Sequence, residues 1–253
     1  MTDNNSFVRD IRDIVEANPQ IHEIEGEKYS SINLHRIDTE HHVSQLCFND
    51  LSSLVEIIKT EALAGPTRLF EPAEHASKKV NIIINDPWSV TVCTTLGEKN
   101  NREYPYGTNA EKSPFMFGQS YDFEKFVIAL RSMFVDNEGR KYILDLLKQV
   151  GSYDDYSIDD NGVMQNIKAS SGVHLNAGEK AINPIVRLMP YRTFREVQQP
   201  ESDFLFRMLN DKRFALYEAD GGVWKLEAKD NIRDYLAAAL GEEIKNGTVV
   251  ILG

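Results

Sequence analysis

Apolar residues recur at helical spacing over 50–63 and over 122–150. The first stretch has a capping residue, Asn49 or Asp50, at its start and the helix-ending pair Gly65-Pro66 beyond it. The second stretch is broken by one short polar turn, which is typical of an αα-hairpin. Each predicted helix has a single apolar stripe, so we expect these helices to cover one face of a sheet.

Short runs rich in β-branched and aromatic residues predict strands elsewhere. Lys78–Ile84 and Ser89–Thr95 are separated by a short loop and predict a β-hairpin. From residue 163 onward the runs follow one another closely, and Asp220-Gly221-Gly222 between the last two suits a hairpin turn. These predicted strands are Val163–Ser170, Gly172–Leu175, Pro184–Met189, Phe204–Leu209, Phe214–Ala219 and Val223–Ala228.

The two ends of the chain have patterns of their own. Ser6–Ala17 has apolar residues at helical spacing, and the polar stretch Gln20–Lys28 separates it from a moderately alternating run at Tyr29–Ile37. A docking helix, a link and a strand are expected in that order. Near the other end, a helix over 230–240 is followed by Thr248–Leu252, which is long enough for a final edge strand.

Together these patterns predict an α+β fold with a mostly antiparallel sheet core, with strands concentrated in residues 163–228 and flanked by amphipathic helices. Residues 1–28 are expected to be an N-terminal helical arm and linker. Residues 29–253 are expected to form a single α+β domain with a β-rich C-terminal half. Asn100–Gln119 has few periodic apolar residues and reads as a long loop, and such loops are usually functional or interfacial. We therefore expect any ligand surface there or in a groove between copies.

Charge and cysteine content narrow the functional classes. The chain has 28 basic and 39 acidic residues, for a net charge of −11. This balance disfavours a protein that coats a nucleic-acid backbone, although it leaves room for a small basic groove. Cys47 and Cys93 lie in apolar surroundings without metal-ligand spacing and are expected to be buried thiols in a reducing cytoplasm. Neither a signal peptide nor a membrane-spanning run is visible, so no membrane partner is expected.

The sequence contains no recognisable catalytic motif, and we assign no catalytic residue and no cofactor. The six histidines form neither HxxxH nor HExxH. A cluster of four carboxylates is a weak candidate for a metal site. If Gly162 were the sixth residue of an EF-hand loop, Lys168 would be the twelfth, where a bidentate carboxylate is required. A solvated turn is therefore favoured over a cation site of another kind. The four carboxylates are Asp154, Asp155, Asp159 and Asp160.

The stretch Asn183–Ala228 combines aromatic residues with arginines and acids. Guanidinium groups bind carboxylates or phosphates through paired hydrogen bonds, so an anion-binding surface is one interpretation. Because as many acids lie close by, an internal or intersubunit ion-pair network is favoured, and the aromatic residues are assigned to a core rather than to base stacking. A catalytic Ser202 would need a histidine base that the local sequence does not supply. The subunit-contact or ion-pair candidates are Arg187, Arg192, Arg195, Glu196, Glu201 and Arg207.

Two segments, NPIVRLMPYRTFREVQQPESDFLFR and ALYEADGGVWKLEAKDNI, make the chain resemble bacteriophage and prophage proteins of the YfdQ-like family. Those proteins similarly place a helical middle region, here FEKFVIAL, before a β-rich half with an L-x-PYRTF-x-E-x-x-QPES signature. The resemblance covers residues 51–235 loosely and Asn183–Ala228 more specifically. It carries no established activity. It implies viral origin and expression in the cytoplasm of a bacterial host, with an accessory role in infection or prophage maintenance.

The expected function is a non-enzymatic, self-assembling phage accessory protein whose main partner is a second copy of the chain. The alternative is a binding protein of phage DNA metabolism or host-defence interference. Such a protein would bind nucleic acid, or would capture a host protein through acidic mimicry. A metal-dependent hydrolase that uses the Asp154–Asp160 cluster is less favoured than either.

Overall fold

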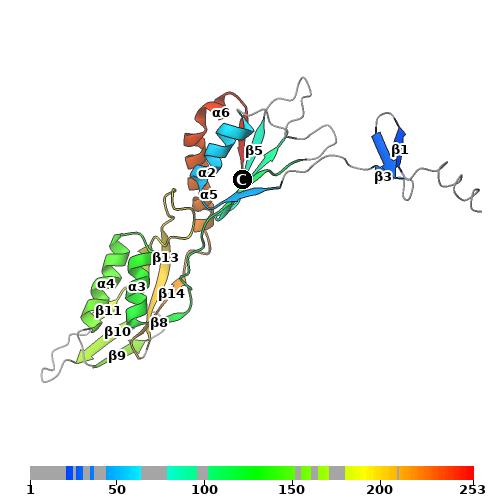
Figure 1. Cartoon of the computed structure of the whole chain (residues 1–253). Coiled ribbons are helices and arrows are strands. Elements are labelled where there is room, and N and C mark those ends of the chain that lie inside the picture. Colours follow the sequence, from blue (N-terminus) through cyan, green and yellow to red (C-terminus); the bar gives the residue numbers. More distant parts are fainter. Residues whose placement is uncertain are drawn as a thin grey trace, which may run out of the picture. The chain divides into compact units, whose positions relative to one another are not determined.

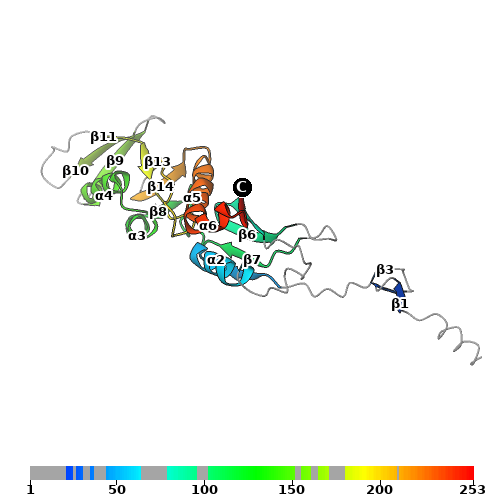
Figure 2. The same cartoon turned by 90° about the horizontal axis from the view of Figure 1, so that it is seen from above.

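The computed structural model of the 253-residue chain describes residues 21–24, 27–30, 35–36, 44–63, 79–95, 102–151, 155–160, 165–170, 180–209 and 211–253 (Figure 1, Figure 2). The chain divides into two compact units, Met1–Val43 and Ser44–Gly253.

The N-terminal unit contains a small antiparallel sheet of three strands in the order β1-β2-β3. The stretch predicted as a link, Gln20–Lys28, instead contains β1 and the start of β2, which pair with each other. The predicted helix at Ser6–Ala17 lies outside the described residues. The strands are β1 (Ile21–Ile24), β2 (Glu27–Ser30) and β3 (His35–Arg36).

In the larger unit, a five-stranded sheet has the order β15-β5-β6-β7-β4. Its middle strands form an antiparallel meander, whereas each edge strand pairs parallel with its neighbour. The predicted hairpin at 78–95 and the predicted edge strand at 248–252 are both confirmed. The strands are β4 (Leu46–Phe48), β5 (Val80–Asp86), β6 (Ser89–Thr94), β7 (Tyr106–Asn109) and β15 (Val249–Leu252).

Helices cover one face of this sheet and form the first core with it (Figure 1). Val80, Ile82 and Ile84 alternate along β5 and are fully or almost fully buried against apolar helix residues such as Leu54 and Leu236. This is the spacing that a half-buried strand requires. The covering helices are α2 (Leu51–Ile57), the π-helical turn η1 (Ile58–Ala62), α5 (Trp224–Ala239) and α6 (Gly241–Lys245).

A four-stranded antiparallel sheet, with order β12-β13-β14-β8, forms the second core with two helices. The predicted αα-hairpin is confirmed, and Figure 1 shows both helices beside β13 and β14. Phe126 of one helix stacks on Phe206 and Phe214 of the sheet, with ring centroids 6.0 and 5.5 Å apart. The elements are β8 (Ser120–Asp122), α3 (Phe123–Met133), α4 (Glu138–Gly151), β12 (Ile185–Leu188), β13 (Ser202–Leu209) and β14 (Arg213–Glu218).

A third, three-stranded antiparallel sheet has the order β11-β10-β9. Its Gln165 side chain reaches β13, donating to the Met208 carbonyl and accepting from the Met208 N–H, both at 2.9 Å. The buried amide therefore satisfies backbone groups that another strand would otherwise bind. The strands are β9 (Asp155–Asp160), β10 (Gln165–Ser170) and β11 (Lys180–Ile182), and the predicted strand Gly172–Leu175 lies outside the described residues.

The structure corrects the predicted strand at Val223–Ala228, because α5 begins at Trp224. Trp224, Ala228, Ile232 and Leu236 are buried at intervals of four residues, which is the period of a helix. The glycines before them do have positive φ, but they serve the entry to this helix, and Asp211 and Lys212 form the turn between β13 and β14.

Two further expectations change. The long loop expected at Asn100–Gln119 contains β7, whose residues pair with both β6 and β4. Cys47, expected to be buried, is exposed on the edge strand β4, while Cys93 is buried as expected. The α+β class and its mostly antiparallel sheets are confirmed. Within the described part of the chain, no helix is long and apolar enough to cross a membrane.

Candidate functional site

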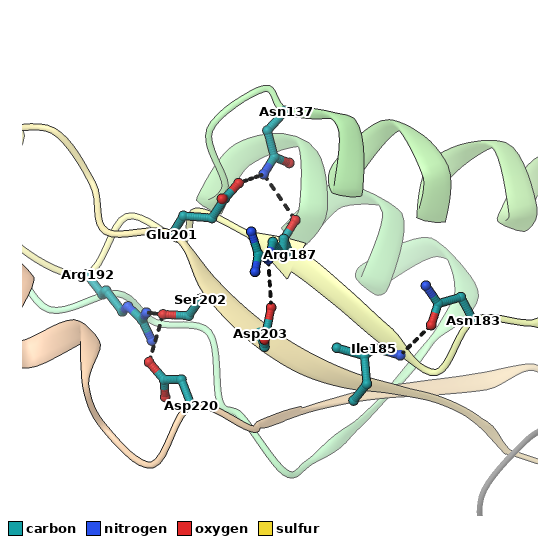
Figure 3. A network of polar contacts seen from close by, with 9 residues as sticks. All are labelled: Asn137, Asn183, Ile185, Arg187, Arg192, Glu201, Ser202, Asp203 and Asp220. Carbon is teal, nitrogen blue, oxygen red and sulfur yellow. Dashed lines mark hydrogen bonds and ion pairs between the residues drawn. The ribbon is translucent and has the colours of Figure 1, made fainter.

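Arg192 is the centre of the polar network in the segment between β12 and β13 (Figure 3). Its residue is only 3% exposed, and its guanidinium lies 3.9 Å from the ring centroid of Trp224. Nη1 donates to Glu218 at 2.8 Å, and Nη2 donates to the Ser202 hydroxyl. Burial lowers the pKa of Arg192 to about 10, against the attraction of Glu218 and Asp220, so the side chain is still charged at neutral pH.

Ser202 and Asp220 complete this network. The Ser202 hydroxyl donates to Asp220 Oδ2 at 2.9 Å, and Asp220 also accepts from the backbone N–H of Gly222 and of Trp224. Burial alone would raise the pKa of Asp220. These three hydrogen bonds and the charge of Arg192 outweigh burial and lower it. A carboxylate with a lowered pKa is a poor general base, so Asp220 is not suited to activating Ser202 as a nucleophile. The hydrogen bond between Ser202 and Asp220 instead joins the start of β13 to the start of α5.

The other predicted ion-pair residues occupy separate places. Arg187 Nε donates to Asp203 at 3.1 Å across β12 and β13. Glu196 accepts the N–H of Leu51 at 2.7 Å, which ties the segment to the start of α2. The structure therefore does not bring all the predicted residues together as one cluster, although Asn137 donates to both the Arg187 carbonyl and Glu201. Of the rest, Arg195 stacks on Tyr191, Glu201 accepts from Asn137, and Arg207 lies on β13.

A shallow groove of about 510 Å³ lies beside Arg187, between the start of α4 and the edge strand β12. Figure 3 shows Arg187 and Asp203 facing each other there, with Asn183 and Ile185 further along the strand. The backbone approach is close: a Cβ on Gly139 would lie 1.9 Å from the Arg187 carbonyl oxygen. Because the guanidinium is already matched by a carboxylate, the groove offers little attraction to an anion.

The predicted metal candidates remain without a described geometry. Asp154 lies outside the described residues. Asp155, Asp159 and Asp160 belong to β9, whose backbone alone is described. Among the side chains that the structure describes, no three His, Cys, Asp or Glu groups converge as metal ligands would.

The face of the five-stranded sheet that points away from the first core has a distinctive composition, and we call it the uncharged face. In the register of the sheet, one row of neighbours crosses all five strands, and none of them is charged. A second row, Val250, Asn81 and Cys93, lies beside it. The row across the sheet is Leu252, Ile83, Thr91, Gly107 and Cys47.

The uncharged face is most accessible at the two edges of the sheet. Val250 and Leu252 of β15 are 44% and 47% exposed, and Cys47 of β4 is exposed at the opposite edge, whereas Leu46 lies on the core side of the sheet in register with Tyr106. Among the described residues, no further strand pairs with the outer side of β15 or of β4. Apolar residues at open sheet edges are typical of protein–protein contacts.

The outward face of the four-stranded sheet differs, and we call it the arginine face. Arg187, Arg207 and Arg213 lie on three adjacent strands, and Asp203 is paired with the first of them. The same face exposes Tyr217 by 40%, Ile185 by 42% and Leu209 by 37%. This face combines hydrogen-bond donors with an aromatic ring and can therefore meet a polar or anionic partner.

Comparison of the chain with protein-family models, with curated proteins and with solved structures gives no match.

Sequence reasoning concentrated on the arginines of 183–228 and missed the uncharged face. The five strands that form it are far apart in the chain, from β4 to β15, and only their register shows that their outward residues share one surface. The available signal was local: β5 and β6 both lack Lys, Arg and Glu in a chain in which 26% of residues are charged.

Proposed function

We propose that the protein is a non-enzymatic structural or interaction protein that assembles with copies of itself. From the resemblance described above, we further propose that it acts as an accessory protein of a bacteriophage or prophage in its bacterial host. The observation that carries the assembly proposal is the uncharged face of the five-stranded sheet, with its exposed edge residues Leu252 on β15 and Cys47 on β4.

Electrostatics favours this face as the contact between copies. Each copy has a net charge of −11, so two copies repel one another wherever their charged surfaces approach. A contact made through uncharged residues avoids that repulsion locally. It also avoids the free-energy cost of removing charged groups from water.

Burial of the exposed apolar side chains supplies the attraction. Val250 and Leu252 are each nearly half exposed, and full burial of such a side chain stabilises by about 1.5–3 kcal/mol, so about 1 kcal/mol remains available from each. An interface also gains from the backbone hydrogen bonds that an open edge can form.

Size-exclusion chromatography with light scattering on the full chain tests the proposal. We expect a particle several times larger than the 28.8 kDa chain at micromolar concentration. Leu252→Lys should weaken assembly at least tenfold, because it places a charge in the apolar contact. Leu226→Lys makes the same change at an α5 residue that is 66% exposed and should leave assembly unchanged. A strictly monomeric wild-type chain would contradict the proposal.

The arginine face favours a second candidate function, binding of nucleic acid or of a host protein. Single strands bind to surfaces that combine basic groups with an exposed aromatic ring, here Arg213 and Tyr217. Direct binding predicts that labelled single-stranded DNA is retained at low salt and released as salt rises. Arg213→Ala should weaken retention, and Lys225→Ala on α5 is the matched control. Retention that ignores both salt and Arg213 would count against this function.

A further inference from the structure

The two edges of the five-stranded sheet have the same strand direction. β15 runs parallel to β5, and β4 runs parallel to β7. Because β5 and β7 are both antiparallel to β6, they run parallel to each other. Both edge strands therefore point the same way, at opposite ends of one sheet.

Both edge strands are short, but neither carries the charged residues or proline that usually prevent strand pairing. Natural proteins protect open edges with charged residues, proline, bulges or a covering element. β15 reads VVIL and β4 reads LCF, without a charge or a proline. In the described part of the chain, no side chain bonds to the backbone of Val249–Leu252.

The four-stranded sheet shows that this chain does protect another edge. Next to β12, Asn137 donates to the Arg187 carbonyl at 3.1 Å, and Val135 donates its N–H to the Met189 carbonyl at 2.9 Å. Further along, Gln165 binds both backbone groups of Met208. One contact on β12, one just beyond its end and one on β13 therefore occupy this side of the four-stranded sheet, whereas no side-chain contact is described on Val249–Leu252 at the β15 edge.

We propose that β15 of one copy pairs in parallel with β4 of the next copy, so that one continuous sheet runs through the assembly. This inference rests on the proposed function and deepens it by naming the two surfaces that meet. The row of uncharged residues that ends at Leu252 in one copy would continue at Cys47 in the next. Repeating this head-to-tail contact builds a ring if the rotation closes and a filament if it does not.

A two-fold dimer satisfies the edges less well. Pairing β15 with β15 of a second copy would be antiparallel and would leave β4 open in both copies. Pairing β4 with β4 would leave β15 open in the same way. One head-to-tail contact uses both edges and keeps the strand direction that each edge already has beside its neighbour.

Cross-linking tests this arrangement directly in the full chain. The chain has two cysteines, and Cys93 is buried, so Cys47 on β4 is the accessible thiol. Leu252→Cys adds a second thiol on β15. A bismaleimide that spans about 8 Å reaches diagonal neighbours on adjacent strands. We expect a ladder of dimers, trimers and larger species from Leu252→Cys, and a loss of that ladder from the double variant Cys47→Ser with Leu252→Cys.

The remaining outcomes also decide the question. Dimers alone, kept when Cys47 is replaced, would show β15 paired with β15 and overturn the proposal. An assembly that light scattering detects but that gives no cross-link from Leu252→Cys or from Val250→Cys would overturn it too, while leaving the proposed function standing. A monomeric wild-type chain would instead remove the proposed function itself, so the two failures are distinguishable.

Discussion

The two larger sheets of this protein share an architecture and differ in what they expose. Each has helices on one face and a core between helices and sheet. The outward face of the four-stranded sheet carries Arg187, Arg207 and Arg213, whereas the outward row across the five-stranded sheet carries no charge. Exposed apolar residues lose free energy in water. On the four-stranded sheet the exposed Ile185 and Leu209 share their face with arginines, whereas Leu252 and Val250 at the β15 edge have no charged neighbour in their rows. The comparison is why we propose the five-stranded sheet, rather than the four-stranded one, as the part that meets another copy.

The comparison implies that stability and assembly can be changed separately. Phe206 is fully buried in the second core and stacks on Phe126. Phe206→Ala should lower the free energy of unfolding by about 3–5 kcal/mol, measured by urea denaturation, because it removes a buried ring and leaves a cavity. The fraction that remains folded should assemble as the wild type does. Loss of assembly in parallel with the loss of stability would mean that the two sheets do not have separate roles.

Sequence reasoning gave the α+β class and most elements, because their signals are local. The stripe in α2 and the αα-hairpin are examples: each needs only its own residues to be recognised. The error at Trp224 arose where a glycine pair suited both a hairpin turn and a helix entry. The period of four that continues to Leu236 distinguishes the two, but it becomes visible only over a window longer than the predicted strand.

The candidate site was less predictable because it depends on strand order. Arg192 was nominated from composition, but its buried contact with Trp224 joins elements 32 positions apart. Pairing of β15 with β5 joins residues still further apart, and no local pattern specifies which strand becomes an edge. The absence of charged residues from a strand can be read from the sequence, but only the strand register shows which of those residues share one face of the sheet.

The next largest expected effect on stability comes from a close backbone contact between α4 and the four-stranded sheet. A Cβ on Gly139 would meet the Arg187 carbonyl oxygen at 1.9 Å, and the backbone there cannot easily move. Gly139→Ala should therefore destabilise by about 1–3 kcal/mol in urea denaturation. Gly241→Ala in α6 is the matched control, because a Cβ there meets nothing within 4 Å. Equal stability of the two variants would contradict the close packing of α4 on β12.

The buried arginine should matter more than an exposed one. Arg192→Met keeps apolar contact with Trp224 but removes the hydrogen bonds to Ser202 and Glu218, at a cost of about 2 kcal/mol. Arg187→Met breaks an ion pair whose arginine side chain is 71% exposed, so the cost should stay below about 1 kcal/mol. Thermal or urea unfolding of the pair measures the difference. An equal loss of stability in the two variants would show that burial does not make the Arg192 hydrogen bonds contribute more than the exposed Arg187 ion pair.

The smallest expected effect concerns the start of α2, beside the five-stranded sheet. Asp50 accepts the N–H of Ser53 at 2.6 Å and the hydroxyls of Ser52 and Ser53, and these hydrogen bonds lower its pKa. A carboxyl whose pKa is lower in the folded state stabilises fully above its unfolded pKa, near 3.9, and loses that contribution as pH falls through the folded value.

Asp50→Asn tests this contribution because asparagine still caps a helix but does not titrate. At pH 7 we expect the variant to be less stable by at most about 1 kcal/mol, and the difference should shrink as the pH is lowered below 4. Urea denaturation across pH 2.5–7 measures both the stability difference at neutral pH and its decrease in acid. α3 begins with an equivalent cap, Asp122, whose pKa the N–H of Lys125 lowers, so Asp122→Asn provides the same comparison beside the four-stranded sheet. A difference that stays constant with pH would show that the Asp50 charge does not stabilise α2, and that the cap acts only as a neutral hydrogen-bond acceptor.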